Sequence, residues 1–278
     1  MTGRLRTPGA GGREEEAAMS GERATDDAFE RSTPVPGVAL IRITAKPLGV
    51  LTVAARRRLT AAIAALADDP AVRCAVLTGQ GPAFSAGSNI REFEVTTEWI
   101  EGARVQEVAL NEYIANSPVP IVAACNGVTL GGGAVMALAC DVRVASASAT
   151  FGFPEVKLGA MAGATGTQRL AQLVGPGHAL RLMLTGRVID AAEALLIGLV
   201  EEVVDGEALL PRALQLAQEI AAVSPAAVRA TKRCVRGGLA GGYAAGMQLE
   251  AEVTAPLGLT ADAIEGKAAF LEKRAPAF

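Results

Sequence analysis

The chain has 278 residues, of which half are apolar and a fifth are charged, and its formal net charge is −3. This length and composition are sufficient for a large buried core in one or two domains. The acidic balance argues against a nucleic-acid partner, because a nucleic-acid-binding surface usually carries a basic stripe. No apolar run reaches the roughly 18 residues of a membrane-spanning helix, so we expect no membrane partner either.

The first 33 residues are rich in Gly, Arg and Glu and contain no apolar segment of the kind found in secretory signals. A segment with so few large apolar side chains cannot offset the entropy that ordering removes. We therefore predict a disordered N-terminal extension over residues 1–33, a folded core over residues 34–205 and a helical C-terminal region over residues 206–278.

The folded part alternates between strand-like and helix-like segments as far as about residue 151. Short apolar runs predict buried strands, and longer periodic runs behind a capping residue predict helices. We predict strands at 38–44, 71–78, 119–124, 141–145 and 149–151, with helices at 52–67, 97–115 and 134–139 between them. Further helices are predicted at 166–174, 177–184, 191–196, 206–222, 225–237, 243–256 and 260–274. This order is typical of an α/β fold with a helical appendage.

Several conspicuous side chains are interpreted as structural. The basic cluster Arg56-Arg57-Arg58 lies inside the predicted helix 52–67 and is interpreted as a solvated helix face. His178, the single histidine, is interpreted as a helix-start residue. The cysteines have no metal-ligand spacing, so we interpret them as buried hydrophobic residues of a reducing, cytoplasmic compartment. These cysteines are Cys74, Cys125, Cys140 and Cys234.

Two glycine-rich segments, 84–89 and 127–133, each follow a predicted strand and lead into a predicted helix. A backbone without side chains can bring its N–H groups close to a ligand, and a helix N-terminus adds its dipole. If the two segments converge, they form a pair of donors for an oxyanion that develops on a carbonyl. A flexible turn is the alternative interpretation of three consecutive glycines. Neither segment has the spacing of a phosphate-binding loop or of a dinucleotide fingerprint.

With these segments placed, residues 36–278 resemble the crotonase superfamily, which comprises the enoyl-CoA hydratases and isomerases. The resemblance is carried by short motifs whose order and spacing match the family. They are Val76-Leu77-Thr78-Gly79, Phe84-Ser85-Ala86-Gly87-Ser88, Ala124-Cys125-Asn126-Gly127, Gly131-Gly132-Gly133, Cys140-Asp141, Phe151-Gly152-Phe153-Pro154-Glu155, Leu158-Gly159, Gly166-Thr167-Gln168-Arg169-Leu170, Thr185-Gly186-Arg187, Gly198-Leu199-Val200 and Phe270-Leu271-Glu272-Lys273-Arg274.

The resemblance implies an α/β fold with a crotonase-like β-β-α spiral core and a helical C-terminal trimerisation region. It implies a homotrimer or a dimer of trimers, and an acyl-CoA thioester as the substrate. No separate cofactor and no metal are expected, because coenzyme A is part of the substrate.

Carried over by position, the resemblance implies that the backbone N–H groups of Ser88 and Gly132 form an oxyanion hole and that Glu155 is the acid/base. Val135 occupies the helix position at which a typical hydratase of the family has a second glutamate. Hydration needs a base that activates water and an acid that protonates the α-carbon. A single carboxylate suits a 1,3-proton shift better, so we predict double-bond isomerisation. A hydratase, or a lyase or hydrolase, is the alternative, and a non-catalytic acyl-CoA-binding scaffold is an alternative of another class.

The resemblance also implies contacts with coenzyme A along the first glycine-rich segment and near the C-terminus. Arg91 would face the CoA phosphates, and Lys273 would reach the 3′-phosphate at a neighbouring subunit. The full set of implied CoA-binding residues is Ala86, Ser88, Asn89, Ile90, Arg91 and Lys273. Gly49 and Asn89 stand where an asparagine and an aspartate are common in the family.

Two further expectations concern the reacting end of the substrate. Glu155 lies near Phe151 and Phe153 in the sequence, so we expect partial desolvation to raise its pKa. Candidates for lining the acyl pocket are Trp99, Glu107, Tyr113 and Tyr243.

Overall fold

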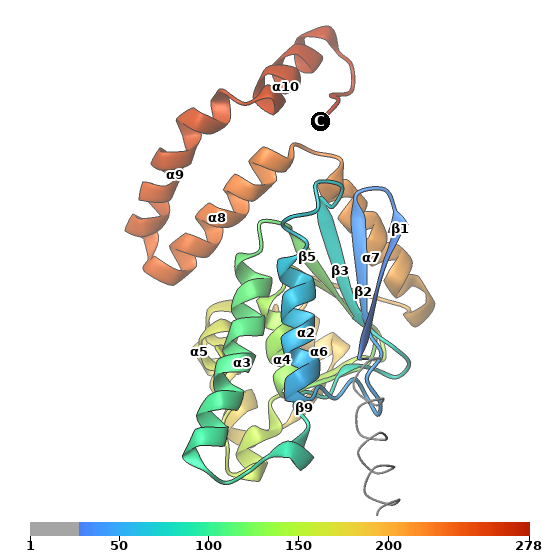
Figure 1. Cartoon of the computed structure of the whole chain (residues 1–278), viewed down its shortest axis with the longest axis vertical. Helices are drawn as coiled ribbons and strands as arrows, with labels where there is room; N and C mark the ends of the chain where they lie inside the picture. The colour runs from blue at the N-terminus through green and yellow to red at the C-terminus, as the bar shows by residue number, and fades with distance from the viewer. Residues whose placement is uncertain (1–27) are drawn as a thin grey trace, which may run out of the picture.

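The computed structural model describes residues 28–278 and contains a six-stranded and a four-stranded sheet (Figure 1). The larger sheet has the strand order β1-β2-β3-β5-β7-β10, and β1 is antiparallel to β2 while the other neighbours are parallel. Its strands are β1 (Phe29–Val35), β2 (Val38–Ile43), β3 (Cys74–Gly79), β5 (Ile121–Cys125), β7 (Val142–Ser146) and β10 (Glu202–Val204). Every residue of β3 and β5 is buried, as expected for central parallel strands covered on both faces.

The smaller sheet has the strand order β4-β6-β8-β9. Its strands are β4 (Ala83–Ser85), β6 (Val128–Leu130), β8 (Thr150–Gly152) and β9 (Val188–Asp190). The chain enters β4 soon after β3 and enters β6 soon after β5. The neighbouring strands β3 and β5 of the larger sheet are therefore each followed by one of the neighbouring strands β4 and β6 of the smaller sheet. Because β4 and β6 pair in parallel, the two glycine-rich segments end at the same edge.

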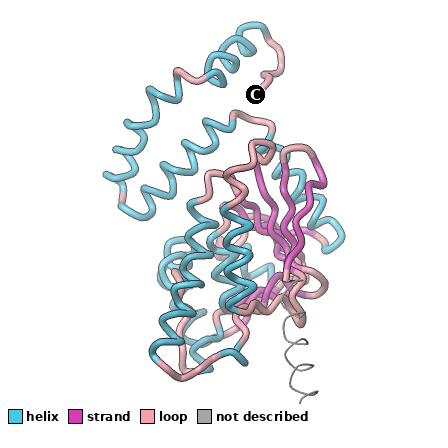
Figure 2. The backbone as a smooth tube through the Cα atoms, in the orientation of Figure 1, coloured by secondary structure: helices cyan, strands magenta, loops and turns pink. Residues whose placement is uncertain are grey.

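Helices cover both faces of the larger sheet, as the tube in Figure 2 shows. On one face lie α2 (Val53–Ala64), α3 (Thr97–Asn116) and α4 (Gly132–Ala139), followed by α5 (Gly166–Thr185) and α6 (Ala191–Leu196). On the other face lies α7 (Gly206–Ala221), whose apolar side packs on β2, β3 and β5. A non-helical Gly175 with φ of 76° divides α5, which agrees with the two predicted helices there.

The last helices form an arm that extends away from the sheets (Figure 1). The arm consists of α8 (Pro225–Gly241), α9 (Tyr243–Gly258) and α10 (Ala261–Glu272). α8 and α9 form a hairpin in which Gly238 and Gly246 allow close backbone approach, since a Cβ on Gly246 would lie 3.0 Å from Gly238 Cα. The chain end returns to the body, where Arg73 donates to the Phe278 carbonyl at 2.8 Å. None of the residues of α8 and α9 is buried.

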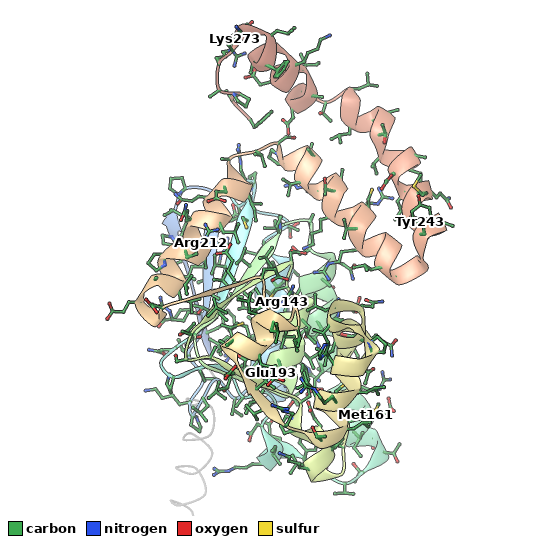
Figure 3. The ribbon with its side chains drawn as sticks, turned by 180° about the vertical axis from the view of Figure 1, so that it is seen from behind. Arg143, Met161, Glu193, Arg212, Tyr243 and Lys273 are labelled. Atoms are coloured by element: carbon green, nitrogen blue, oxygen red, sulfur yellow. The ribbon has the colours of Figure 1, made fainter. Side chains whose placement is uncertain are left out.

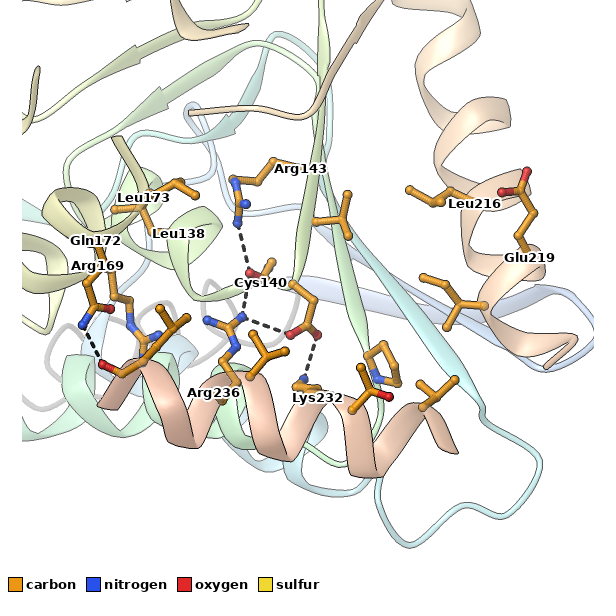
Figure 4. Close-up of a pocket in the computed structure, with 18 of the residues that line it drawn as sticks. Leu138, Cys140, Arg143, Arg169, Gln172, Leu173, Leu216, Glu219, Lys232 and Arg236 are labelled. Atoms are coloured by element: carbon orange, nitrogen blue, oxygen red, sulfur yellow. Dashed lines mark hydrogen bonds and ion pairs between the residues drawn. The ribbon is translucent and has the colours of Figure 1, made fainter. Parts of the chain in front are cut away.

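Asp141, the residue before β7, ties α8 to the body beside an apolar groove, which Figure 4 shows. Lys232 Nζ lies 2.7 Å and an Arg236 guanidinium nitrogen 3.0 Å from the Asp141 carboxylate. Asp141 also accepts a hydrogen bond from the backbone N–H of Ile121. The Lys232 side chain is only 10% exposed, and its burial lowers its pKa, so Asp141 stabilises a cation that solvent reaches poorly.

We expect Asp141→Ala to lower the free energy of unfolding by about 3 kcal/mol, because it leaves the Lys232 ammonium buried without its counter-ion. Glu252→Ala is the control, since it breaks an exposed ion pair with Arg233 and should change stability by less than about 1 kcal/mol. Urea denaturation measures the change in unfolding free energy of both variants from the shift of the midpoint, provided that the m value is unchanged. Equal midpoints for the two variants would contradict the role of Asp141.

The structure confirms the predicted alternation of strands and helices and the helical C-terminal part, with small shifts at element ends. The prediction of disorder is wrong for residues 29–33, which belong to β1 and pair with β2; residues 1–27 lie outside the described part. The strands β4, β6, β9 and β10 were not predicted.

Cys74, Cys125 and Cys140 are buried free thiols, while Cys234 is half-buried. Among residues 28–278, no helix has the length and hydropathy that a membrane span requires.

Candidate active site

The first glycine-rich segment is held in place by backbone hydrogen bonds to the turn before α2. Leu51 N–H donates to the Gly87 carbonyl at 2.9 Å, and Asn89 N–H donates to the Leu51 carbonyl at 3.0 Å. Gly87 adopts φ of 95°, which favours glycine, and its N–H is taken by the Ser85 hydroxyl. The Ser88 N–H between them donates to no acceptor within residues 28–278.

The second glycine-rich segment ends at the N-terminus of α4. Gly131, with φ of 53°, precedes the helix, and Gly132 is the first helical residue. The N–H of a first helical residue has no acceptor inside its helix, and the helix dipole places partial positive charge there. Gly133 allows this helix start to lie against β4, because a Cβ there would meet the Ser85 carbonyl oxygen at 2.1 Å.

The two segments converge. A Cβ on Gly87 would lie 2.8 Å from Gly132 N, and a Cβ on Gly132 would lie 3.7 Å from Ser88 N. The N–H groups of Ser88 and Gly132 therefore lie next to each other, in a space that glycines leave open. This is the geometry that a pair of donors for one oxyanion requires.

Glu155 lies beside these donors. It belongs to the short 3₁₀ helix η3 (Pro154–Leu158), and its Oε1 lies 3.3 Å from the position of a Cβ on Gly131. Oε2 is buried and has no hydrogen-bond partner in the described part of the chain. Burial raises the pKa of this carboxyl, and the negative charge of Glu107 raises it further, while a backbone hydrogen bond opposes the rise. The direction predicted from the neighbouring phenylalanines is confirmed.

Val135 places no carboxylate in the site. Its side chain is buried and packs toward α5, where a Cβ on Gly166 would meet Val135 Cγ2 at 2.7 Å. A valine and a glycine thus fill this helix–helix contact, and the position has no polar group.

A second carboxylate reaches the site from α3. Glu107 Oε1 accepts a hydrogen bond of 2.5 Å from the Ser88 hydroxyl and lies 3.2 Å from an Arg56 guanidinium nitrogen. The sequence offered Glu107 only as a candidate for the acyl pocket. The interpretation of Arg56 as part of a solvated face is wrong, because Arg56 is 4% exposed, whereas Arg57 beside it is exposed. A helix pattern alone does not show that the partner of Arg56 comes from another helix.

The proposed CoA-binding residues fall in two places. Residues 86–91 lie along the first segment and η2 (Ile90–Glu92), where Asn89 caps η2 by accepting from Arg91 N–H at 3.2 Å. Ile90 and Arg91 are exposed. Lys273 follows α10 near the tip of the arm, far from Met161 on the loop after η3 (Figure 3). A single chain therefore does not bring Lys273 to the site.

The other candidates lie farther out. Trp99 packs against Phe93 with ring centroids 4.7 Å apart, near the start of α3. Tyr113 lines a separate groove with Pro118, and Tyr243 lies on the arm and is 84% exposed. His178 is exposed on α5.

A family model described as enoyl-CoA hydratase/isomerase matches residues 35–278 of the chain. The chain belongs to the enoyl-CoA hydratase/isomerase family. It is an enzyme of this family, and membership implies an acyl-CoA substrate. The predicted crotonase fold is confirmed by solved relatives, so the two sheets and the C-terminal helices are those of the family.

Named relatives of the enzyme are mostly hydratases. A "Probable enoyl-CoA hydratase" from Rhizobium meliloti is 40% identical over 231 residues, which are 83% of this chain and 90% of the relative. A "Crotonyl-CoA hydratase" from Syntrophomonas wolfei is 42% identical over 218 residues, covering 77% and 83% of the two chains. The crystal structure of an enoyl-CoA hydratase from Bacillus anthracis has a TM-score of 0.87 at 35% identity and covers 91% of this chain and 99% of its own.

Proposed function

We propose that the enzyme isomerises the double bond of an enoyl-CoA thioester, with Glu155 as the single acid/base and the N–H groups of Ser88 and Gly132 as the oxyanion hole. The observation that carries the proposal is the buried Oε2 of Glu155, which has no hydrogen-bond partner among residues 28–278 and lies beside the converging donors. A carboxylate with a raised pKa is a better base near neutral pH than an ordinary glutamate.

The net change in the proposed reaction is the transfer of one proton from C2 to C4 and the shift of one double bond. Glu155 removes a proton from C2 of a 3-enoyl thioester, the electron pair of that C–H bond forms a C1–C2 double bond, and the π pair of the carbonyl passes to the thioester oxygen. The Ser88 and Gly132 N–H groups hydrogen-bond this oxygen and stabilise the dienolate. The carbonyl then re-forms from the oxygen pair, the C1–C2 π pair moves to C2–C3, and the C3–C4 π pair takes the proton from Glu155 at C4, so the double bond lies between C2 and C3. No water is consumed, which agrees with the apolar Val135.

For the other end of the substrate, we propose that residues 86–91 line the entry of coenzyme A and that the exposed Arg91 pairs with its phosphates. Lys273 would act on CoA bound by a neighbouring subunit, since it lies at the tip of the arm. This role requires an oligomer, and we propose a homotrimer or a dimer of trimers. The exposed apolar residues of the arm support it; they include Tyr243, Leu259, Phe270 and Leu271.

Hydration of a 2-enoyl-CoA is the second candidate, and two observations favour it. The relatives named above are hydratases. Glu107 also brings a second carboxylate to the site, where it borders, with Gly87 and Gly132, a cavity of about 10 Å³. This is about the space that one water molecule needs.

Liquid chromatography coupled to mass spectrometry, which separates double-bond isomers of equal mass by retention time, distinguishes the candidates when purified enzyme is incubated with 2-enoyl-, 3-enoyl- and 3-hydroxyacyl-CoA. Isomerisation converts the 3-enoyl thioester without a change in mass, whereas hydration of the 2-enoyl thioester adds one water. We expect the first reaction to be the faster. Turnover of none of the three substrates would contradict both candidates.

A further inference from the structure

Three elements meet at the Ser88 side chain. Arg56 comes from α2, Glu107 from α3, and Ser88 from the first glycine-rich segment. The Ser88 hydroxyl donates to Glu107 at 2.5 Å and accepts from Arg56 at 3.0 Å, while Arg56 and Glu107 lie 3.2 Å apart. Each member thus contacts the other two, so the three side chains form one closed unit.

This unit is shielded from solvent. The Arg56 side chain is 5% exposed and that of Glu107 is 24% exposed, so salt screens their interaction less than it screens a surface pair. Burying a guanidinium is unfavourable, and it lowers the pKa of Arg56 despite the opposing charges of Glu107 and Glu92. Because burial of this cation is unfavourable, we look for a role of Arg56 other than stabilising the fold.

The unit lies against the proposed oxyanion hole. Ser88 Oγ is 3.3 Å from the position of a Cβ on Gly132, and the Ser88 N–H is itself a proposed donor. Without a nearby cation, the Glu107 carboxylate would repel a negative oxygen that develops there. Arg56 is the cation that contacts this carboxylate.

We propose that Arg56 is a positioning residue of the oxyanion hole, which fixes the Ser88 segment through its hydroxyl and cancels the charge of Glu107 beside the developing enolate. The inference rests on the proposed function of Ser88, Gly132 and Glu155. Arg56 touches no reacting atom and acts through Ser88 and Glu107.

The charged groups around the base make the effect measurable. The negative charge of Glu107 on α3 raises the pKa of Glu155. Glu107 also faces Arg56 on α2, and the charges of Glu107 and of Glu92 on η2 both act to raise the pKa of Arg56. Removing the Arg56 charge leaves Glu107 uncompensated, so the pKa of Glu155 should rise. Removing the Glu107 charge should lower it. The acidic limb of kcat/KM follows this pKa.

The test compares Arg56→Gln with Arg57→Gln, which removes an exposed charge next to it on the same helix. We expect Arg56→Gln to lower kcat roughly 10- to 100-fold with little change in KM, since a displacement of about 1 Å can reduce a rate about 10²-fold. Its acidic limb should move to higher pH. Arg56→Lys should restore the limb but only part of kcat, because an ammonium keeps the charge without the planar fork. Arg57→Gln should match the wild type.

The second measurement removes the negative charge of Glu107 and should shift the acidic limb in the opposite direction. Glu107→Gln keeps an acceptor for the Ser88 hydroxyl and should move the limb to lower pH, both alone and in the Arg56→Gln background. Should Arg56→Gln be too unstable to purify, Glu107→Gln alone tests the charge of the unit, and an acidic limb that does not move to lower pH in Glu107→Gln overturns the inference.

The inference is overturned if Arg56→Gln matches Arg57→Gln in kcat and in pH profile, or if Arg56→Gln changes only the melting temperature. Glu155→Gln is measured in parallel. An active Glu155→Gln overturns the proposed function itself, whereas an inactive one beside an unaffected Arg56→Gln overturns only the role of Arg56.

Discussion

Gly87→Ala is expected to reduce kcat by about 10²- to 10³-fold, the effect of losing one oxyanion donor. The added Cβ would lie 2.8 Å from Gly132 N and 3.1 Å from the Leu130 carbonyl oxygen, so the two glycine-rich segments must separate. Separation moves the Ser88 and Gly132 N–H groups out of reach of a single oxygen atom. Steady-state kinetics with the preferred enoyl-CoA measures the loss.

Gly81→Ala is the matched control for this prediction. Gly81 also has a positive φ, of 70°, but a Cβ there meets no atom within 4 Å. Both substitutions place alanine in the left-handed region, at a strain of about 1–2 kcal/mol, but only Gly87→Ala crowds the donors. We expect Gly87→Ala to melt at a somewhat lower temperature than Gly81→Ala, because only its Cβ displaces backbone, and to have a far lower kcat. Equal kcat values for the two variants would show that the convergence of the segments has no part in catalysis.

Glu155→Gln is expected to lower kcat by about 10²- to 10⁴-fold, the usual contribution of a general acid or base. For the wild type, kcat/KM should rise with pH through a pKa above the ordinary glutamate range, because the base must be deprotonated and burial raises its pKa. Glu250→Gln, an exposed change on α9, is the control and should keep the wild-type profile.

Glu155→Gln should also stabilise the folded protein at neutral pH. A carboxyl whose pKa is raised by folding adds stability below its unfolded pKa of about 4.3, and this stability is lost as pH rises through the folded pKa. Glu155→Gln removes the charged form, so its melting temperature should exceed that of the wild type at pH 7. The difference should shrink toward about pH 4. A lower melting temperature at pH 7 would contradict the burial of an unpaired charge at Glu155.

The parts of the fold predicted from sequence are those with a strong local pattern. β3 and β5 are continuous apolar runs because the larger sheet covers them on both faces. The three-residue strands β4, β6, β9 and β10 are too short to show a period of two. β1 is an edge strand with mostly exposed side chains and a proline, so its sequence lacks the apolar alternation that would distinguish it from an extension.

In the candidate site, too, the residues that could be predicted from the sequence are those in local motifs. The glycine-rich segments and Glu155 lie in local motifs, and the apolar residues next to Glu155 in the sequence already indicate the burial that raises its pKa. The ion pair of Arg56 and Glu107 joins two helices, and each residue alone resembles an ordinary solvated charge on an amphipathic helix. Only the packing of α2 against α3 reveals that Arg56 is buried.

The most direct measurement compares the rates of wild type and Glu155→Gln with a 3-enoyl-CoA and with crotonyl-CoA. We predict that the wild type converts the 3-enoyl thioester faster than it hydrates crotonyl-CoA, and that Glu155→Gln loses both reactions. Fast hydration of crotonyl-CoA by the wild type that persists in Glu155→Gln would contradict the one-base mechanism.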